Sequence, residues 1–432
     1  MEEHEASRAA YVTMERSRVP LGPLNKGLGP MDGPLTPLQI AEQRWNLLHE
    51  DLSLPTAVLY EDKLAHNLAW MQRFIQAYGV NLAPHGKTTM APALFARQLQ
   101  TGAWGITLAT AHQSRVAHEH GVRRVLMANQ LVGKQNMEIV SRLLRDETFE
   151  FHCLVDSAQQ ADQLGEFFSV HRQKLNVLIE LGVDGGRTGI RNSQELDALL
   201  AALHRWRDHL AVSGVELYEG VLQDETDIRK FLHRAVEVAA KLAKGNHFDR
   251  NPAVLSGAGS AWYDIVAEVF SAADIGYPVE IVLRPGCYLT HDVGVYREAQ
   301  IQIQSRNPIA QKMRSGLLPA LQLWAYVQSI PEKDKAILTL GKRDAAFDAG
   351  LPTPSLHYRP GQARPDACPS RWELFRMMDQ HAYMKISEGD DVRVGDMIGL
   401  DISHPCLTFD KWRYLPVLDS SYQVIDIVQT FF

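Results

Sequence analysis

Short apolar runs alternate with longer stretches of helical spacing along residues 56–284. The run TAVLY at 56–60 is followed by a segment whose apolar residues recur every three or four positions, and Gly79 ends it. This order predicts one strand and then one helix. The rhythm continues, and further strands are predicted near residues 80–84, 105–110, 124–128, 151–155, 175–181, 213–218, 252–256 and 280–284.

Nine predicted strands therefore precede Pro285, most of them separated by helix-like stretches. Eight strands alternating with helices over about 230 residues match the size of a (β/α)8 TIM barrel, and the ninth strand is available as a passage into the next domain. A doubly wound open sheet is the competing α/β architecture, but no Gly-rich dinucleotide turn follows the first strand. The strand count and the length favour the barrel.

The pattern changes after Pro285, where strand-like alternation and β-branched runs are separated by turns. It predicts a second, mainly β domain that contains the segments AQIQIQS, LQLWAYVQSI, KAILTLG, MIGLDI and YQVIDIVQTFF. We expect three regions: an N-terminal arm over 1–50 with Gly and Pro punctuation, the barrel over 51–290, and the β domain over 291–432.

Charge and cysteine usage narrow the functional classes. The chain has 44 basic and 51 acidic residues, a net charge of −7 with neutral histidine, which disfavours a nucleic-acid partner. No run approaches the roughly 18 apolar residues of a membrane span, and the N-terminus lacks the features of a secretory signal. The four cysteines are too few and too scattered for a disulfide framework. We therefore expect a cytoplasmic protein without a membrane partner.

A lysine follows the strand predicted near 80–84, in the sequence PHGKT at 84–88. The active site of a barrel is built at the C-terminal ends of its strands, so Lys87 is expected at the barrel mouth. Partial desolvation there would lower the pKa of the amine and make it a Schiff-base nucleophile. The alternative is an ordinary solvated loop lysine.

Two further strand ends carry candidate binding residues. The sequence ELGVDGGRTG at 180–189 is a glycine-dense turn that lets the backbone approach a ligand and presents Arg187. Tyr218, in the sequence YEG, places an aromatic ring at the same rim. The alternatives are an ordinary β-to-α loop and a tyrosine that serves packing alone.

The sequence SGAGS at 256–260 follows the next strand and precedes a helix. Barrels commonly bind phosphate with their last loops, through bare backbone N–H groups and a helix N-terminus. A carbonyl-reactive lysine and a phosphate loop at one barrel mouth suggest pyridoxal 5′-phosphate bonded to Lys87. A phosphosugar aldolase that forms a Schiff base with its substrate would show the same two elements.

A candidate metal motif, SHPC at 403–406, lies near the C-terminus. The imidazole of His404 and the thiolate of Cys406 are good zinc ligands. The H-x-C spacing alone is a weak motif, because catalytic zinc usually has three protein ligands. The alternative is a buried cysteine beside a surface histidine.

Taken together, these motifs resemble the family of D-serine dehydratases (D-serine deaminases) and D-threonine aldolases, pyridoxal-phosphate enzymes with an alanine-racemase-like fold. The resemblance covers roughly residues 50–432. PHGKT is similar to the family's Schiff-base lysine motif, DGGRTG to its cofactor-ring arginine loop, SGAGS to its phosphate loop and LRPGCYLTHD to its exit from the barrel. The resemblance implies that Lys87 bonds the cofactor aldehyde and that Arg187 contacts the ring or its phenolic oxygen. It places Tyr218 in the surroundings of the ring. The phosphate would be bound by Ser256, Gly257 and Gly259.

The C-terminal motif separates the two branches of that family. The dehydratase pattern is His-x-Cys, suited to zinc, and the aldolase pattern is His-x-Asp, suited to harder ions; here it is His404-Pro405-Cys406. Pro405 and the following LTFDKW are similar to a bacterial amino-acid deaminase subgroup. The resemblance implies a homodimeric lyase that uses pyridoxal phosphate and Zn2+ for β-elimination of D-serine, or of a related D-3-hydroxy amino acid, to a 2-keto acid and ammonia.

Three other functions stay open at this point. Retro-aldol cleavage of a D-3-hydroxy amino acid, as in D-threonine aldolase, uses the same cofactor but splits Cα–Cβ and yields glycine and an aldehyde. Racemisation needs a second acid/base group on the opposite face and no metal. A non-catalytic pyridoxal-phosphate carrier would need neither the second domain nor the H-x-C element.

Overall fold

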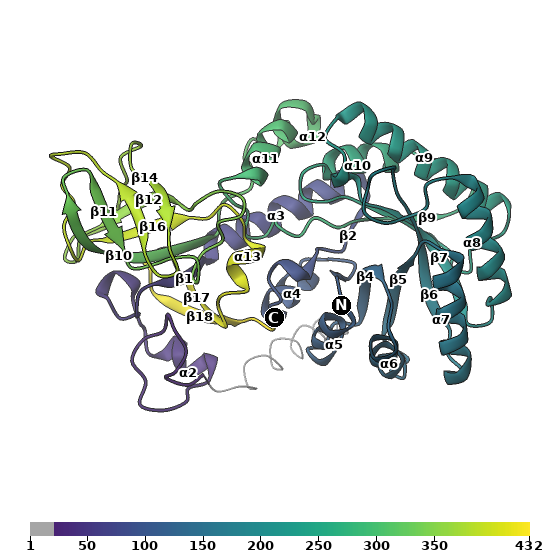
Figure 1. Cartoon of the computed structure of the whole chain (residues 1–432), viewed down its shortest axis with the longest axis horizontal. Helices are drawn as coiled ribbons and strands as arrows, with labels where there is room; N and C mark the ends of the chain where they lie inside the picture. The colour runs from purple at the N-terminus through teal and green to yellow at the C-terminus, as the bar shows by residue number, and fades with distance from the viewer. Residues whose placement is uncertain (1–20) are drawn as a thin grey trace.

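The computed structural model describes residues 21–432, which form two domains side by side (Figure 1). Backbone hydrogen bonds from Trp104 to Leu82 and from Thr107 to Pro84 join the two ends of the first domain's curled parallel sheet. The sheet therefore closes into a ring, and the predicted TIM-barrel-like fold is confirmed. Its strands are, in spatial order, β2 (Asn81–Leu82), β9 (Val279–Leu283), β8 (Ala253–Gly257), β7 (Leu210–Leu217), β6 (Leu175–Leu181), β5 (Glu150–Val155), β4 (Arg124–Gln130) and β3 (Ile106–Leu108).

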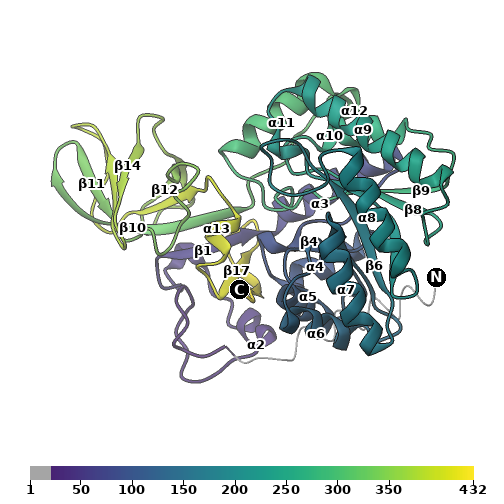
Figure 2. The same cartoon turned by 45° about the vertical axis from the view of Figure 1, so that its right-hand side comes forward.

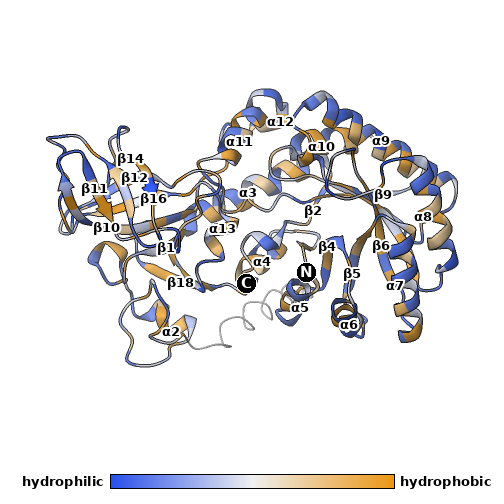
Figure 3. Ribbon diagram, viewed as in Figure 1, coloured by the Kyte–Doolittle hydropathy of each residue, from blue (hydrophilic) through white to orange (hydrophobic). Residues whose placement is uncertain are grey.

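Helices between these strands turn their apolar faces toward the sheet (Figure 3). In α9, for example, the Asp224 side chain accepts hydrogen bonds from the N–H groups of Thr226 and Asp227, and Ile228 and Leu232 are buried one turn apart. Residue periodicity alone thus predicts this half of the molecule well. The helices are α3 (Glu61–Tyr78), α4 (Pro92–Gln100), α5 (Ala111–Glu119), α6 (Lys134–Leu143), α7 (Ala158–His171), α8 (Ser193–Arg205), α9 (Glu225–Lys244) and α10 (Tyr263–Ser271).

The second domain is mainly β, as predicted, and is built around one long strand, β10 (Leu321–Glu332). Its main sheet has the order β13-β12-β16-β10-β1-β17-β18, and a smaller group of strands, β11, β14 and β15, extends from β10. The remaining bounds are β1 (Thr56–Tyr60), β11 (Lys335–Leu338), β12 (Thr353–Tyr358), β13 (Asp366–Ala367), β14 (Glu373–Met377), β15 (Ala382–Lys385), β16 (Met397–Asp401), β17 (Tyr414–Leu418) and β18 (Val424–Gln429).

Strand β1 belongs to the second domain and not to the barrel, where the expected boundary at residue 51 would place it. It pairs antiparallel with β10 and parallel with β17. All five of its residues are buried, and a strand covered on both faces gives the same continuous apolar run in a barrel or in the centre of a mixed sheet. Consequently β9 is the strand that completes the barrel and is not a passage out of it.

The segment AQIQIQS is helical and not a strand, because it lies within α11 (Val295–Arg306). Asp292 Oδ1 accepts hydrogen bonds from the N–H groups of Gly294 and Tyr296 at the start of this helix. Gln300 and Ile303 are buried at a spacing of three residues, which is the spacing of a helix face. The alternation of Gln and Ile in the sequence therefore resembles a strand although the segment is a helix. A short helix, α12 (Pro308–Lys312), follows before β10.

The described part of the predicted arm, residues 21–50, packs on the second domain (Figure 2). Leu21, Ile40 and Trp45 share a buried cluster with Trp324 and Tyr414. The arm contains one short helix, α2 (Pro37–Glu42), and residues 1–20 lie outside the described part of the chain. Over residues 21–432, no helix is long and apolar enough to cross a membrane.

Candidate active site

A cavity of about 490 Å3 opens at the barrel mouth where the second domain meets it. This volume suits a small cofactor together with a small substrate. The helix α13 (Cys406–Phe409) lies between the two domains and contributes to the wall (Figure 1). Six of the eight residues singled out from the sequence line this one cavity: Lys87, Arg187, Tyr218, Gly259, His404 and Cys406.

Lys87 sits on a single 3-10 turn, Gly86–Thr88, in the loop that follows β2. A side chain on Gly86 would place its Cβ 2.8 Å from both Ile106 and Phe95, so only glycine lets the turn press against the barrel. The turn thereby presents the amine of Lys87 to the cavity, the position expected for a residue that bonds a cofactor.

His85 lies two residues before this lysine, and the sequence analysis did not predict a role for it. Burial lowers the pKa of His85 well below its usual value, and the charges of Lys87, Arg284 and Arg187 lower it further. The ring is therefore neutral, and within residues 21–432 its buried Nδ1 has no hydrogen-bond partner. An unpaired polar atom at a cavity wall is available to a bound molecule.

The loop that carries Arg187 is folded around two other arginines. Arg191 donates to the carbonyl of Gly186 at 3.0 Å, and Arg234 of α9 donates to the carbonyls of Gly182 and Ile190 at 2.7 and 2.8 Å. These contacts leave the Arg187 guanidinium free to face Tyr218, whose ring centroid lies 5.1 Å away.

The SGAGS loop differs in part from the expectation of bare N–H groups. The buried carboxylate of Glu219 accepts hydrogen bonds from the N–H groups of Ala258, at 3.0 Å, and Gly259, at 2.6 Å. Glu219 therefore holds the loop in shape and already occupies two of its donors. A Cβ on Gly259 would lie 3.0 Å from the ring of Tyr218, so the loop and this ring are closely packed.

Ser256 and Gly257 lie within β8 and do not line the cavity. The Ser256 hydroxyl is fully buried and donates to the carbonyl of Val282 at 2.9 Å. On the cavity side, Ser260 follows the loop, and α10 begins at Tyr263 without a side-chain cap. Of the residues around this loop, Ala258, Gly259 and Ser260 line the cavity, so an anion bound there would meet these residues first.

A buried ion pair supports the cavity floor. Arg284 contacts Glu216 closely, and its guanidinium also donates to Ser256 Oγ at 3.1 Å and to the Leu217 carbonyl at 3.0 Å. Burial raises the pKa of Glu216, and the charge of Arg284 opposes this shift. Arg284 reaches the cavity, so it adds positive potential beside Lys87 and Arg187.

His404 and Cys406 face the cavity from the second domain. His404 Nδ1 donates to Asp348 Oδ2 at 2.7 Å, and Cys406 Sγ lies 3.4 Å from Thr88 Oγ1. A hydrogen bond from the Cys287 thiol, together with that from His404, lowers the pKa of Cys406. Among the side chains described, no three or more His, Cys, Asp or Glu already converge as a metal site. Neither Asp348 nor Cys287 was singled out from the sequence.

Comparison with known proteins identifies the family to which the barrel domain is similar. The family model "Alanine racemase, N-terminal domain" matches residues 60–279, just over half of the chain. The chain belongs to this family. A second model, "Putative serine dehydratase domain", matches residues 320–418 and so accounts for most of the β domain and its H-x-C motif.

The chain is also similar to two enzymes and to solved structures. The chain is 24% identical to the D-threonine aldolase of an Arthrobacter species over 366 residues, which is 82% of this chain and 86% of that enzyme. It is 30% identical to the D-threo-3-hydroxyaspartate dehydratase of Delftia sp. strain HT23 over 139 residues, 32% of this chain and 36% of that enzyme. A solved structure of a D-threo-3-hydroxyaspartate dehydratase, a cysteine-to-alanine mutant in the metal-free form, superposes with a TM-score of 0.69 at 20% identity and covers 90% of this chain and 99% of its own.

Proposed function

We propose that the protein is a pyridoxal-phosphate- and zinc-dependent lyase that removes water from D-serine, or from a related D-3-hydroxy amino acid, to give a 2-keto acid and ammonia. The observation that carries the proposal is the placement of Lys87 on one wall of a single cavity and of His404 and Cys406 on another. A dehydratase and an aldolase among the similar proteins support lyase chemistry on D-3-hydroxy amino acids.

The cavity fits pyridoxal phosphate in size and in charge. Lys87, Arg187 and Arg284 supply positive charge for a phosphorylated cofactor, and Gly259 and Ser260 line the same cavity where a phosphate would lie. The bound cofactor would supply an aldehyde for Lys87 and an electron sink that stabilises negative charge at the substrate's Cα. Glu219, which pairs with the loop N–H groups, keeps this site in shape.

Each wall of the cavity has a task in elimination. Lys87 would hold the cofactor through Nζ, and the same amine, when free, would be placed to take the Cα proton of the substrate. The Tyr218 ring and the Arg187 guanidinium, 5.1 Å from its centroid, flank the same space and restrict how the bound molecule tilts. Orientation of the Cα–H bond toward Lys87 decides whether this bond is the one that breaks.

Departure of the β-hydroxyl needs an acid. Zinc bound by His404 Nε2 and Cys406 Sγ would supply Lewis acidity at that oxygen. The donor set fits zinc, because Asp348 engages Nδ1 of His404 and leaves Nε2 as the ligand atom. The similar dehydratase supports a metal in this role, since its cysteine mutant is described as metal-free.

Retro-aldol cleavage is the second candidate, because the relative that matches most of the chain is a D-threonine aldolase. The His404-Pro405-Cys406 pattern, with a soft thiolate where an aldolase would place a carboxylate, favours elimination.

Assembly and compartment are further parts of the proposal. We also propose a homodimer in the cytoplasm; four free cysteines are compatible with a reducing compartment. Light scattering that finds an active monomer would reject the dimer.

Product analysis tests the function. The holoprotein is incubated with D-serine, D-threonine and D-3-hydroxyaspartate, with L-serine as the control, and keto acid, ammonia, glycine and aldehyde are quantified. We expect equal amounts of keto acid and ammonia from at least one D-substrate and none from L-serine. Glycine with an aldehyde would assign the aldol reaction instead.

A further inference from the structure

Cys287 brings a second sulfur atom to the proposed zinc site. It lies on the segment that leaves the barrel after β9, and its side chain lines the same cavity as His404 and Cys406. Its Sγ is 3.8 Å from Cys406 Sγ, although the two residues are 119 positions apart in the chain. Both cysteines are free thiols, so the contact is not a disulfide.

The distance between the two sulfurs has a specific chemical meaning. Two thiolates on one tetrahedral zinc, with Zn–S bonds of about 2.3 Å, lie about 3.8 Å apart. A disulfide would need a separation of about 2.05 Å. The barrel and the second domain therefore hold Cys287 and Cys406 at the edge length of a zinc tetrahedron.

The contacts around the pair link all three candidate ligands. Cys406 is hydrogen-bonded to the imidazole of His404 on one side and to the thiol of Cys287 on the other. Thr88 Oγ1 contacts both sulfurs, at 3.4 Å from Cys406 and 3.9 Å from Cys287. Cys406 therefore stands between the other two candidate ligands and contacts both of them.

We propose that Cys287 is a third protein ligand, so that His404, Cys406 and Cys287, which do not converge as a three-ligand group before a metal binds, would form a Cys2His site around one Zn2+. The proposal rests on the zinc-dependent function proposed above and deepens it. Three protein ligands with one position left for substrate is the usual composition of catalytic zinc sites, whereas two ligands hold zinc weakly. The carboxylate of Asp348 behind His404 is the outer partner that such a histidine normally has.

Cobalt substitution tests the number of thiolates on the metal. The holoprotein is loaded with Co2+ under a reducing agent, and the thiolate-to-metal charge-transfer absorption is compared with that of Cys287→Ser. We expect the variant to lose about half of this absorption and to bind Zn2+ at least about tenfold more weakly in competition with a chelator. Cys368→Ser, which alters a cysteine of the second domain away from the cavity, is the matched control and should change neither value.

X-ray absorption of the zinc-loaded wild-type protein gives the same answer without a variant. Two sulfur neighbours at about 2.3 Å are expected. One sulfur neighbour, or an unchanged cobalt spectrum in Cys287→Ser, would overturn the role of Cys287. If Cys406→Ala then abolishes metal binding, the proposed function still stands. A wild-type protein that binds neither Co2+ nor Zn2+ would overturn both this inference and the zinc in the proposed function.

Discussion

The imidazole of His404 donates from Nδ1 to the Asp348 carboxylate at 2.7 Å, across 56 positions of the chain. Because an ionised carboxylate only accepts hydrogen bonds, this contact fixes a proton on Nδ1 and turns Nε2 toward Cys406, with which the ring shares its other hydrogen bond. It therefore determines how His404 can serve a metal or a substrate at the cavity wall.

Removing this carboxylate should weaken zinc binding without unfolding the protein. In Asp348→Ala, His404 loses its orienting partner, and we expect the zinc affinity to fall about 10- to 100-fold. Asp379→Ala, which removes an exposed carboxylate with a 4.0 Å contact to Arg343, is the control and should bind zinc normally. Competition with a chromogenic chelator measures both affinities; an unchanged affinity in Asp348→Ala would show that Asp348 does not support a metal ligand.

Arg234 should influence the cofactor although it lies outside the cavity. It donates to the carbonyls of Gly182, Ile190 and Arg191, and each hydrogen bond contributes about 1 kcal/mol. Arg234→Ala should therefore loosen the Arg187 loop and weaken cofactor binding about tenfold or more, as measured by fluorescence titration. Arg229→Ala, on the same helix but with exposed partners, should bind the cofactor like the wild type. Equal affinities in the two variants would refute the positioning role.

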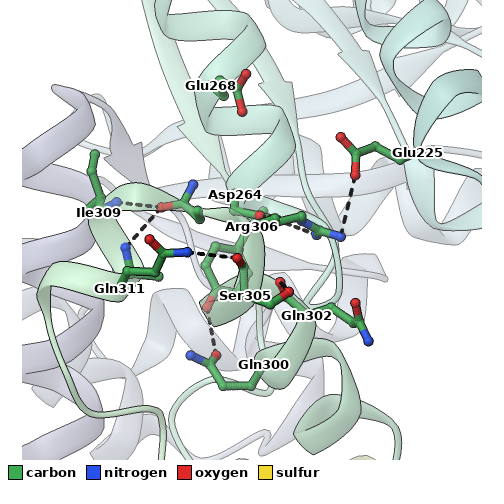
Figure 4. A network of polar contacts seen from close by, with 12 residues as sticks. Glu225, Asp264, Glu268, Gln300, Gln302, Ser305, Arg306, Ile309 and Gln311 are labelled. Atoms are coloured by element: carbon green, nitrogen blue, oxygen red, sulfur yellow. Dashed lines mark hydrogen bonds and ion pairs between the residues drawn. The ribbon is translucent and has the colours of Figure 1, made fainter.

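The start of β10 is reached through α11, and Arg306 anchors this helix to the barrel through ion pairs with Asp264 and, at 3.9 Å, with Glu225. Arg306 binds both carboxylate oxygens of the fully buried Asp264 at 2.8 Å (Figure 4). Arg306→Ala leaves that charge unpaired, so we expect a loss of about 3 kcal/mol in the free energy of unfolding. The control Arg205→Ala breaks an exposed pair with Asp162 and should cost less than about 1 kcal/mol. Denaturant titration would contradict this account if both variants lost the same stability.

The stability of the fold should decrease in acid partly because of Glu150, which begins β5 at the end of the barrel away from the cavity. Burial raises the pKa of Glu150, but His152 and Arg124 outweigh it and lower the pKa to about 2. Because the folded-state pKa lies below that of the unfolded chain, ionised Glu150 stabilises the fold above about pH 4.5, and this is lost as the pH falls toward 2. Glu150→Gln should be less stable than the wild type at pH 7, with a difference that shrinks between pH 4.5 and 2. A pH-independent difference would count against this linkage.

Sequence reasoning found the barrel because its signals are local. Each strand is an apolar run of ordinary length and each helix repeats every three or four residues, so neighbouring residues carry the information. The membership of β1 could not be found this way. Its partner register joins Thr56 to Trp324 and Leu59 to Leu321, and no local pattern reports a pairing across more than 260 residues.

The sequence predicted those residues of the candidate site that belong to short local motifs. Lys87 and Arg187 lie in the loops that follow β2 and β6, so their place at the mouth is a consequence of barrel geometry. The partners that tune the site come from elsewhere in the chain: Glu219 meets the SGAGS loop from 40 positions away, and Cys287 meets Cys406 from 119. Such pairs depend on tertiary packing, which one sequence does not show.

Borohydride reduction of the holoprotein tests the central claim most directly, because it fixes the cofactor to the residue that carries it. Lys87 is placed by its turn at the cavity shared with Arg187 and His404. After digestion and peptide mapping, we expect one pyridoxyl group on Lys87 and none in Lys87→Ala. A label on another lysine, or a wild-type protein that takes up no cofactor, would contradict the account.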